Sequence, residues 1–380
     1  SDEIAEQIWD AAIAEHGTTP VISDPGDELM VEMMSACLGE PVTPEYAPMM
    51  REEMGFVSRD IDWPEGAARP SVLVVGAGAS GIIMGARLDR MGLDYDIVER
   101  GPSVGGVWRD NRYPGAGVDT PNHAYSFSFA RPHRWSRFFS PQADLETYLQ
   151  QTADDCDVTR HVQFETGLTG AQWDDDTQEW RVELETPNGS ESRSYQVLIS
   201  AIGQLNVPKP PPVPGTDSFE GPCFHSSHWP DGLDLTGKRV AVIGTGASSM
   251  QIVPAIADQV AELTVYQRTA QWARPIPRYH EPIPEGSQWL FEHLPFYASW
   301  FRFVMLWRYG DGLLPLLRKD PDWEHPHSIN RANERHRQQM ADHLLTELDG
   351  RADLVEKCMP SYPPYGKRIL LDNGWFATVR

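Results

Sequence analysis

Two stretches of the chain repeat one pattern, in which a short apolar run leads directly into a glycine-rich turn. The first run, at residues 72–75, reads Val-Leu-Val-Val, and the second, at residues 240–243, reads Val-Ala-Val-Ile. A continuous apolar run like the first is typical of a parallel strand that is covered on both faces. A helical pattern and another short strand, at residues 95–98 and 263–266, follow each turn. The pattern predicts an α/β protein with two Rossmann-like dinucleotide-binding domains.

The first turn contains every part of a dinucleotide-binding fingerprint. Gly76, Gly78 and Gly81 have the spacing GxGxxG. The first glycine permits a tight turn, the second lets the backbone approach a pyrophosphate, and the third lets the helix pack on the strand. The next strand ends at Glu99, whose carboxylate can accept a hydrogen bond from a ribose hydroxyl. This site is suited to FAD.

The second turn departs from the first in two ways. Ser249 stands where the third glycine would be, and no acid ends the following strand. Arg268 stands there instead. A carboxylate would repel a 2′-phosphate, whereas an arginine accommodates one, so the second cofactor is predicted to be NADPH. The alternative, a surface arginine unconnected with cofactor choice, stays open.

Helical patterns surround the two predicted domains. Residues 1–66 predict a helical N-terminal extension, with apolar spacing at 4–13 and 29–37 and methionines that fill its core. Residues 289–317 and 330–348 predict further amphipathic helices. We assign residues 67–207 to the first part of an FAD-binding domain. Residues 208–380 would form an NADP-binding domain with a helical insertion at about 285–358, and the proline-rich stretch 206–215 marks the boundary.

Composition narrows the classes of partner. The formal net charge of −23 disfavours nucleic acid and anionic membranes. The sequence shows no signal peptide and no apolar stretch that could span a bilayer, which predicts a cytoplasmic protein. Four dispersed cysteines predict reduced, mostly buried thiols, and the scattered histidines have no ligand spacing, so no metal site is predicted.

A bridge of residues 219–230 lies between the two turns and reads FxGxxxHxxxWP. Its defining positions are Phe219, Gly221, His225, Trp229 and Pro230. This pattern resembles the fingerprint of the Baeyer–Villiger flavin monooxygenases.

Further motifs resemble class B flavin monooxygenases and occur in the order seen there. They are the loop from Gly106 through Tyr113-Pro114-Gly115 to Asp119, and the segment Gly366-Lys367-Arg368. The N-terminal extension and residues 201–206 look most like the 4-hydroxyacetophenone monooxygenase branch.

The resemblance implies a function. NADPH would reduce FAD, O₂ would form a peroxyflavin, and its addition to a ketone would yield an ester or lactone. Arg368 matches the family's catalytic arginine, whose permanent charge can stabilise an oxyanion. Asp119 matches the carboxylate that positions it, and Lys367 would share the 2′-phosphate with Arg268. His225 is interpreted as fixing the bridge, because the peroxide needs no general base.

The resemblance also implies the remaining cofactor contacts. The FAD side would include Gly106, Val107, Trp108, Asp119 and Tyr125, and the NADPH side Gly244, Thr245, Gly246, Ala247, Ser248, Arg268, Thr269 and Lys367.

Two departures keep other functions open. Ile202 occupies a position where the family usually has threonine, and the chain stops at Arg380, so the C-terminal completion of the FAD domain is expected to be missing. The alternatives are a heteroatom-oxidising monooxygenase or NADPH oxidase on the same scaffold, and a non-catalytic FAD/NADP-binding fragment. The identity of the ketone and the oligomeric state stay open, although the extension could form a homodimer contact.

Overall fold

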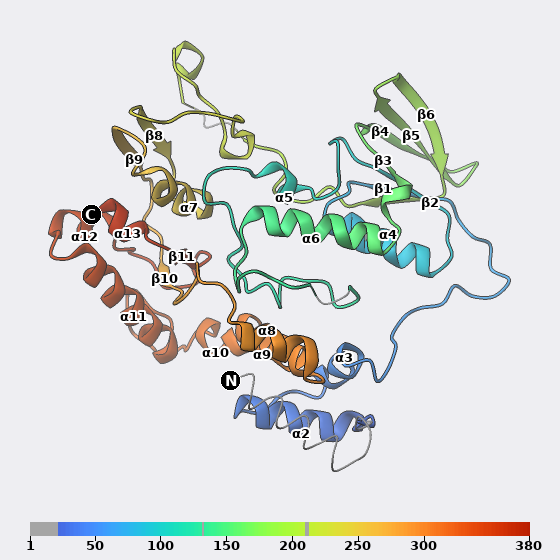
Figure 1. The fold of residues 1–380 in the computed structure, drawn as a ribbon, viewed down its shortest axis with the longest axis horizontal. Helices are drawn as coiled ribbons and strands as arrows, with labels where there is room; N and C mark the ends of the chain where they lie inside the picture. Colours follow the sequence, from blue (N-terminus) through green and yellow to red (C-terminus); the bar gives the residue numbers. More distant parts are fainter. Residues whose placement is uncertain (1–21, 131–132, 210–212) are drawn as a thin grey trace.

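The computed structural model describes residues 22–130, 133–209 and 213–380. Two separate βαβ units lie toward opposite ends of the molecule, with the long helix α6 (Gln142–Asp155) between them (Figure 1). A group of helices runs along one side and includes the N-terminal helices α2 and α3. The prediction of an α/β fold is confirmed.

The first βαβ unit consists of β1 (Val72–Val75), α4 (Ala79–Arg90) and β2 (Tyr95–Val98). These strands join β3 (Val162–Gln163) and β7 (Val197–Ser200) in a parallel sheet of order β3-β2-β1-β7. Every residue of β1 is buried. One face of the strand packs in the core that α4 and α6 share, and the other packs against strand β5. The apolar run thus reflects burial on both faces, as predicted.

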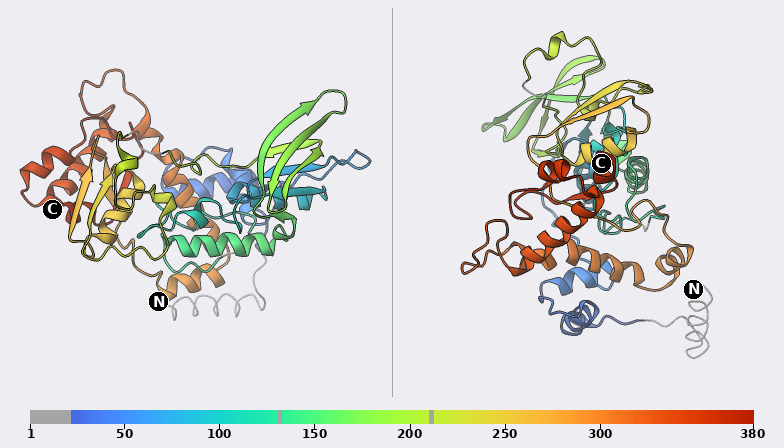
Figure 2. Two further views of the ribbon diagram at one scale, coloured as in Figure 1. Left: turned by 90° about the horizontal axis from the view of Figure 1, so that it is seen from above. Right: turned by 90° about the vertical axis from the view of Figure 1, so that its left-hand side faces the viewer.

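The covering layer on that second face is an antiparallel sheet that stands at one end of the molecule (Figure 2). It contains β4 (Gly167–Asp174), β5 (Glu179–Thr186) and β6 (Gly189–Tyr195). The Asn188-Gly189 turn joins β5 to β6, as its sequence indicates. Residues 194–200 alternate in a pattern that predicts a single hairpin strand, but that prediction is wrong, because the chain leaves this sheet after Tyr195 and continues as β7 beside β1.

The second βαβ unit is smaller. It consists of β8 (Arg239–Ile243), α7 (Ala247–Ile256) and β9 (Glu262–Tyr266), and within the described ranges β8 and β9 pair only with each other. Only one face of this sheet is covered, so Ile243 is 62% exposed. A separate parallel pair, β10 (Ala273–Pro275) and β11 (Leu370–Asp372), lies beside it and brings the C-terminal segment back to this unit.

The helices form two groups. Helices α2 (Gly26–Leu38) and α3 (Tyr46–Glu53) pack on α9 (Tyr297–Tyr309) through a core that includes Met30, Met34 and Met50, so these methionines fill a core as predicted. The predicted helix at residues 4–13 lies outside the described residues. The other α-helices within the described residues are α5 (Val107–Asp110), α8 (Glu285–His293), α10 (Leu314–Leu317), α11 (Arg331–Leu348), α12 (Ala352–Cys358) and α13 (Trp375–Val379).

The structure corrects two sequence expectations and adds an observation on a third. The amphipathic pattern of 289–317 is interrupted at Phe296, which has a φ of 60°, and again at Gly310, so it forms three helices. Cys37 and Cys223 are exposed, so the expectation of mostly buried thiols is wrong for them. Among the helices that the structure describes, none is both long and apolar enough to cross a membrane.

Candidate functional site

The first glycine-rich turn is shaped by contacts with its own chain. Gly76 has a φ of 103°, and a Cβ placed on it would lie 2.7 Å from the carbonyl oxygen of Ala201. A Cβ on Gly81 would lie 1.9 Å from the carbonyl oxygen of Gly76. A Cβ on Gly78 would meet only the Cα of Gly106, at an ordinary 3.6 Å. Packing therefore requires glycine at Gly76 and Gly81. At Gly78 packing does not require it, and the absence of a side chain leaves the backbone accessible beside the turn.

Glu99 lies directly under this turn. Its buried carboxylate accepts hydrogen bonds from the backbone N–H of Ala77 (2.9 Å) and of Gly101 (2.7 Å). It also forms an ion pair with the buried Arg109 at 3.1 Å. Sequence reasoning placed Glu99 correctly beside the turn but missed Arg109. The signal was available, since Arg109 follows Trp108 in the loop already singled out.

The loop after Gly106 brings two predicted cofactor residues together. Gly106 has a φ of 54° and immediately precedes α5, which begins at Val107. The Nε1–H of Trp108 donates to the hydroxyl of Tyr125 over 3.0 Å, and the two rings meet edge to face. This contact holds the loop against the chain that follows Asp119.

Asp119 and Arg368 form an ion pair although 249 residues separate them. The Nη2 atom of Arg368 lies 2.9 Å from Oδ2 of Asp119. The carboxylate side chain is 14% exposed, whereas the guanidinium side chain is 64% exposed. A mostly buried anion thus holds a cation whose other donors are accessible, which is the geometry needed to stabilise negative charge on a bound molecule.

Gln251 is a third member of this arrangement that sequence reasoning missed. It comes from α7 of the second βαβ unit, and its Nε2–H₂ donates to Oδ1 of Asp119 (3.2 Å) and to the carbonyl of Gly117 (2.9 Å). The hydroxyl of Tyr113 donates to its Oε1 at 2.9 Å. Gln251 therefore joins the two units at the ion pair. In the sequence, the only sign of this role is that Gln251 is a long polar residue in the otherwise apolar stretch of α7.

Burial perturbs the acid at this junction. Desolvation raises the pKa of Asp119, and the opposing effects of Arg368 and Gln251 do not fully offset it. Burial likewise raises the pKa of Tyr113, with the charge of Asp119 adding to the shift. The ion pair consequently loosens on acidification at a higher pH than an ordinary aspartate pair would.

The second glycine-rich turn has far more open space than the first. Gly244 has a φ of 107°, and a Cβ on Gly244 or Gly246 would meet no atom of the described chain within 4 Å. Helix α7 begins at Ala247, and within the described ranges no side chain caps it at Gly246. The hydroxyl of Thr245 donates to the carbonyl of Thr269 at 3.1 Å, which ties the turn to the segment after β9.

Two exposed cations lie near this turn. Arg268 follows β9, and Lys367 places its Nζ 4.9 Å from the centre of the Tyr362 ring. The hydroxyl of Tyr362 in turn donates to the carbonyl of Ala270 at 3.0 Å, so the segments that carry the two cations are in contact. That Arg268 and Lys367 share the 2′-phosphate of NADPH stays a prediction.

The bridge has a structural arrangement of its own. The Nδ1 atom of His225 accepts from the backbone N–H of Ser227 at 3.2 Å and so caps the short 3₁₀ helix Ser226–His228. Trp229 packs with Leu235 and Ile252, while Phe219 is 64% exposed. Among the described residues, no hydrogen bond joins His225 to Asp119 or Arg368. Gly221 lies in a bend before this short helix, and the carbonyl of Pro230 accepts a hydrogen bond from the backbone N–H of Leu233 in the turn that follows it.

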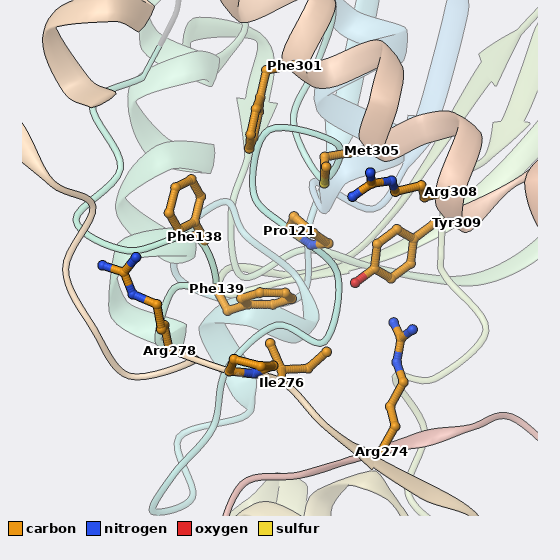
Figure 3. A pocket seen from close by; sticks show the side chains of 11 residues that line it. Pro121, Phe138, Phe139, Arg274, Ile276, Arg278, Phe301, Met305, Arg308 and Tyr309 are labelled. Carbon is orange, nitrogen blue, oxygen red and sulfur yellow. The ribbon is translucent and has the colours of Figure 1, made fainter. Parts of the chain in front are cut away.

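The chain that carries the ion pair also lines a cavity of about 330 Å³. Pro121, which follows Asp119, forms part of one wall. Arg274 forms part of another, and its strand β10 pairs with β11 directly after Arg368. The walls are otherwise largely aromatic or aliphatic (Figure 3). A small organic molecule of moderate size fits such a volume.

The fold agrees with comparisons to known proteins. Residues 69–280 match the family model "Flavin-binding monooxygenase-like", which is more than half of the chain, so the protein belongs to this family. The resemblance to class B flavin monooxygenases seen in the motifs is therefore confirmed.

Named relatives and solved structures refine this placement. The chain is 41% identical over 384 residues to an uncharacterized monooxygenase y4iD of Sinorhizobium fredii, covering 99% of this chain and 57% of that protein. It is 37% identical to a Baeyer–Villiger monooxygenase of Streptomyces coelicolor, covering 81% and 56%. It thus spans little more than half the length of these relatives.

Among solved structures, OTEMO in complex with FAD and NADP matches with a TM-score of 0.68 and 28% identity, covering 82% of this chain and 64% of that one. Cyclohexanone monooxygenase from Rhodococcus sp. Phi1 bound to NADP⁺ matches with a TM-score of 0.67 and 27% identity, covering 83% and 64%.

Proposed function

We propose that the protein is an FAD- and NADPH-dependent Baeyer–Villiger monooxygenase that inserts one oxygen atom beside a ketone carbonyl to give an ester or lactone. The observation that supports this most directly is the Asp119–Arg368 ion pair, held by Gln251 where the two βαβ units meet. Relatives named for this reaction and structures solved with both cofactors point the same way.

The residues around each turn fit the proposed cofactors. Gly78 and Gly246 have ordinary negative φ values and are not crowded by the described chain, so packing does not explain their glycines. A pyrophosphate lying against the backbone does explain them. We therefore assign FAD to the first unit and NADPH to the second, with Arg268 and Lys367 on the 2′-phosphate. When bound, the flavin would supply O₂ activation with electrons from NADPH.

The chain's own residues would then act on the ketone. Among the described residues, the Arg368 guanidinium contacts Asp119 through Nη2 and leaves its other donors accessible to solvent, so it can stabilise negative charge on the carbonyl oxygen. Asp119 holds the guanidinium in place, and Gln251 fixes the second carboxylate oxygen. Trp108 and Tyr125 orient the loop that carries Asp119.

The domain assignment is part of the same proposal. It comprises residues 1–66 as extension, 67–207 as FAD-binding part and 208–380 as NADP-binding part with a helical insertion. A homodimer through the extension is supported by exposed Leu29 and Met33 on α2. A cytoplasmic location and the branch within the family stay predictions.

The test is turnover by the full-length protein. Incubation with NADPH, O₂ and a panel of ketones should produce esters or lactones, with NADPH consumed in proportion. Arg368→Met should lower ester formation by about 100-fold, because one electrostatic donor to a developing oxyanion is lost. Reduction of the bound flavin by NADPH, followed by absorbance, should continue in this variant.

Other outcomes would replace the proposal. Thioether oxidation without ester formation would indicate the heteroatom-oxidising reaction, and NADPH consumption without any oxygenated product would indicate an oxidase. Binding of FAD with no NADPH consumption in the presence of any ketone would contradict the monooxygenase proposal.

A further inference from the structure

The cavity that Pro121 and Arg274 line has an unusual distribution of charge for this protein. The chain has a formal net charge of −23, yet three arginines and no acidic side chain are among the residues that line this cavity. Its apolar wall consists chiefly of Phe138, Phe139, Ile276, Phe301 and Met305. Cations gathered in an apolar pocket of an acidic protein require a physical reason, because like charges repel where water is partly excluded.

The three arginines are not equivalent. Arg278 forms an ion pair with Glu281 at 2.5 Å, so its guanidinium already has an anionic partner. Arg274 and Arg308 form no ion pair with any described residue. Arg274 places its guanidinium 5.3 Å from the centre of the Tyr309 ring, and Arg308 precedes Tyr309 on α9. Figure 3 shows both guanidinium groups approaching Tyr309 on the same side of the cavity, away from Arg278.

The cavity therefore has a positively charged end and an apolar remainder. At one end, Arg274 and Arg308 come from different elements, β10 and α9, and present unpaired donors near a tyrosine. The rest of the wall is apolar and begins at Pro121, close in the chain to Asp119. Guanidinium pairs of this kind recognise carboxylates and phosphates through charge-assisted hydrogen bonds.

We propose that Arg274 and Arg308 bind an anionic group of the substrate, so that the enzyme selects ketones that carry a carboxylate or phosphate on an apolar body. This inference rests on the proposed function, because it names the substrate class of the same site. The apolar wall would hold the body of the ketone, and the two arginines its anionic end.

Binding measurements test the site without depending on turnover. The probe pair is 4-oxo-4-phenylbutanoate and its methyl ester, which share the aryl ketone and differ in charge. Calorimetry at low salt should show the carboxylate binding about tenfold more tightly than the ester, a preference that added salt reduces. Equal affinity for the two probes would overturn the inference.

Matched variants locate the effect. Arg274→Gln and Arg308→Gln should each remove most of the preference for the carboxylate, whereas Arg274→Lys and Arg308→Lys should retain much of it. Arg318→Gln, at an exposed arginine outside the cavity, changes the net charge equally and should leave the preference intact. Thermal unfolding verifies that each variant is folded. An equal loss in Arg318→Gln would contradict the proposed site.

Turnover by the full-length protein tests the proposed function and the proposed anion site separately. It also distinguishes an anionic group of the substrate from a phosphate of the cofactor. If both probes are oxidised at the same kcat/KM, the function holds and the inference fails. If neither ketone reacts while the carboxylate still binds through Arg274 and Arg308, the site holds and the function fails. A rise in the KM for NADPH in the Arg→Gln variants, with the KM for the keto acid unchanged, would assign the arginines to a cofactor phosphate and overturn the inference.

Discussion

The two βαβ units share a motif but are embedded in the molecule differently. In the first, β1 is buried along its whole length within four parallel strands, and the glycines of the turn are crowded by backbone atoms. In the second, two strands expose one face, and the turn glycines have open space around them. The same sequence signature therefore has two causes. In the first turn, steric contacts require glycine at Gly76 and Gly81. In the second, the positive φ of Gly244 requires glycine, whereas neither space nor φ explains Gly246, which is the position that points to a bound ligand.

The largest expected loss of unfolding free energy is at the first glycine-rich turn, which backbone atoms crowd. Gly81→Ala should lower the free energy of unfolding by about 3 kcal/mol, because its Cβ would collide with the Gly76 carbonyl, which cannot move without disturbing the turn. Urea denaturation followed by circular dichroism measures this loss. A change below about 1 kcal/mol would show that the first turn is not sterically fixed by its own chain.

A smaller loss of unfolding free energy should appear on acidification, and it should come from His123. Burial, followed by the charge of Arg302, lowers the pKa of His123 to about 4. In the unfolded chain this histidine takes up a proton near pH 6.5, so below that pH the unfolded state binds more protons and stability falls as pH falls toward 4. Between pH 7 and 5 the loss from this group should be about 2 kcal/mol.

The variant His123→Phe tests this assignment. It fits the surrounding rings of Phe138, Phe291 and Phe301 and should flatten the decline in unfolding free energy between pH 7 and 5. Glu53 has a pKa raised by burial, despite its pairing with Arg302, and titrates in the opposite sense. It is present in both proteins, so their difference isolates the histidine. Identical pH profiles would rule out His123 as the source.

A third prediction concerns the junction between the units. Gln251→Leu removes hydrogen bonds to Gly117, Asp119 and Tyr113 and should cost about 1 kcal/mol of unfolding free energy. Loss of the donor to Asp119 should also raise the pKa of this acid further, so the acid limb of ester formation should move to higher pH. An unmoved pH profile in the full-length enzyme would show that Gln251 does not act through Asp119.

The smallest effect on stability is expected at the open turn. Gly246→Ala should change the free energy of unfolding by no more than about 0.5 kcal/mol, because the new Cβ meets no described atom and the backbone is extended. NADPH affinity, measured by titration of the full-length protein, should nevertheless fall at least about tenfold if a pyrophosphate lies there. Unchanged affinity would remove the ligand-based explanation for this glycine.

The sequence predicted the parts of this molecule that depend on local pattern. Spacing alone identified both turns, and the motif resemblance paired Asp119 with Arg368 across the chain. It could not predict Gln251, because a polar residue on a helix can face solvent as easily as a neighbouring loop. Nor did the helical spacing of 289–317 reveal the break at Phe296, because spacing alone does not register Pro295, whose ring ends a helix at the residue before it. Residues 194–200 alternated like one strand, yet long-range pairing divided them between two sheets.

The place of β7 in the first sheet has a consequence for the order of folding. Its register pairs Val72 with Val197, so this sheet is complete only after a loop of more than a hundred residues has closed. The second unit, in contrast, pairs Arg239 with Glu262. Closing a long loop is entropically slower than closing a short one, so we expect the exposed, weakly covered unit to form early and the buried one late. The sheet that contains the fully buried strand β1 would then be the last to assemble.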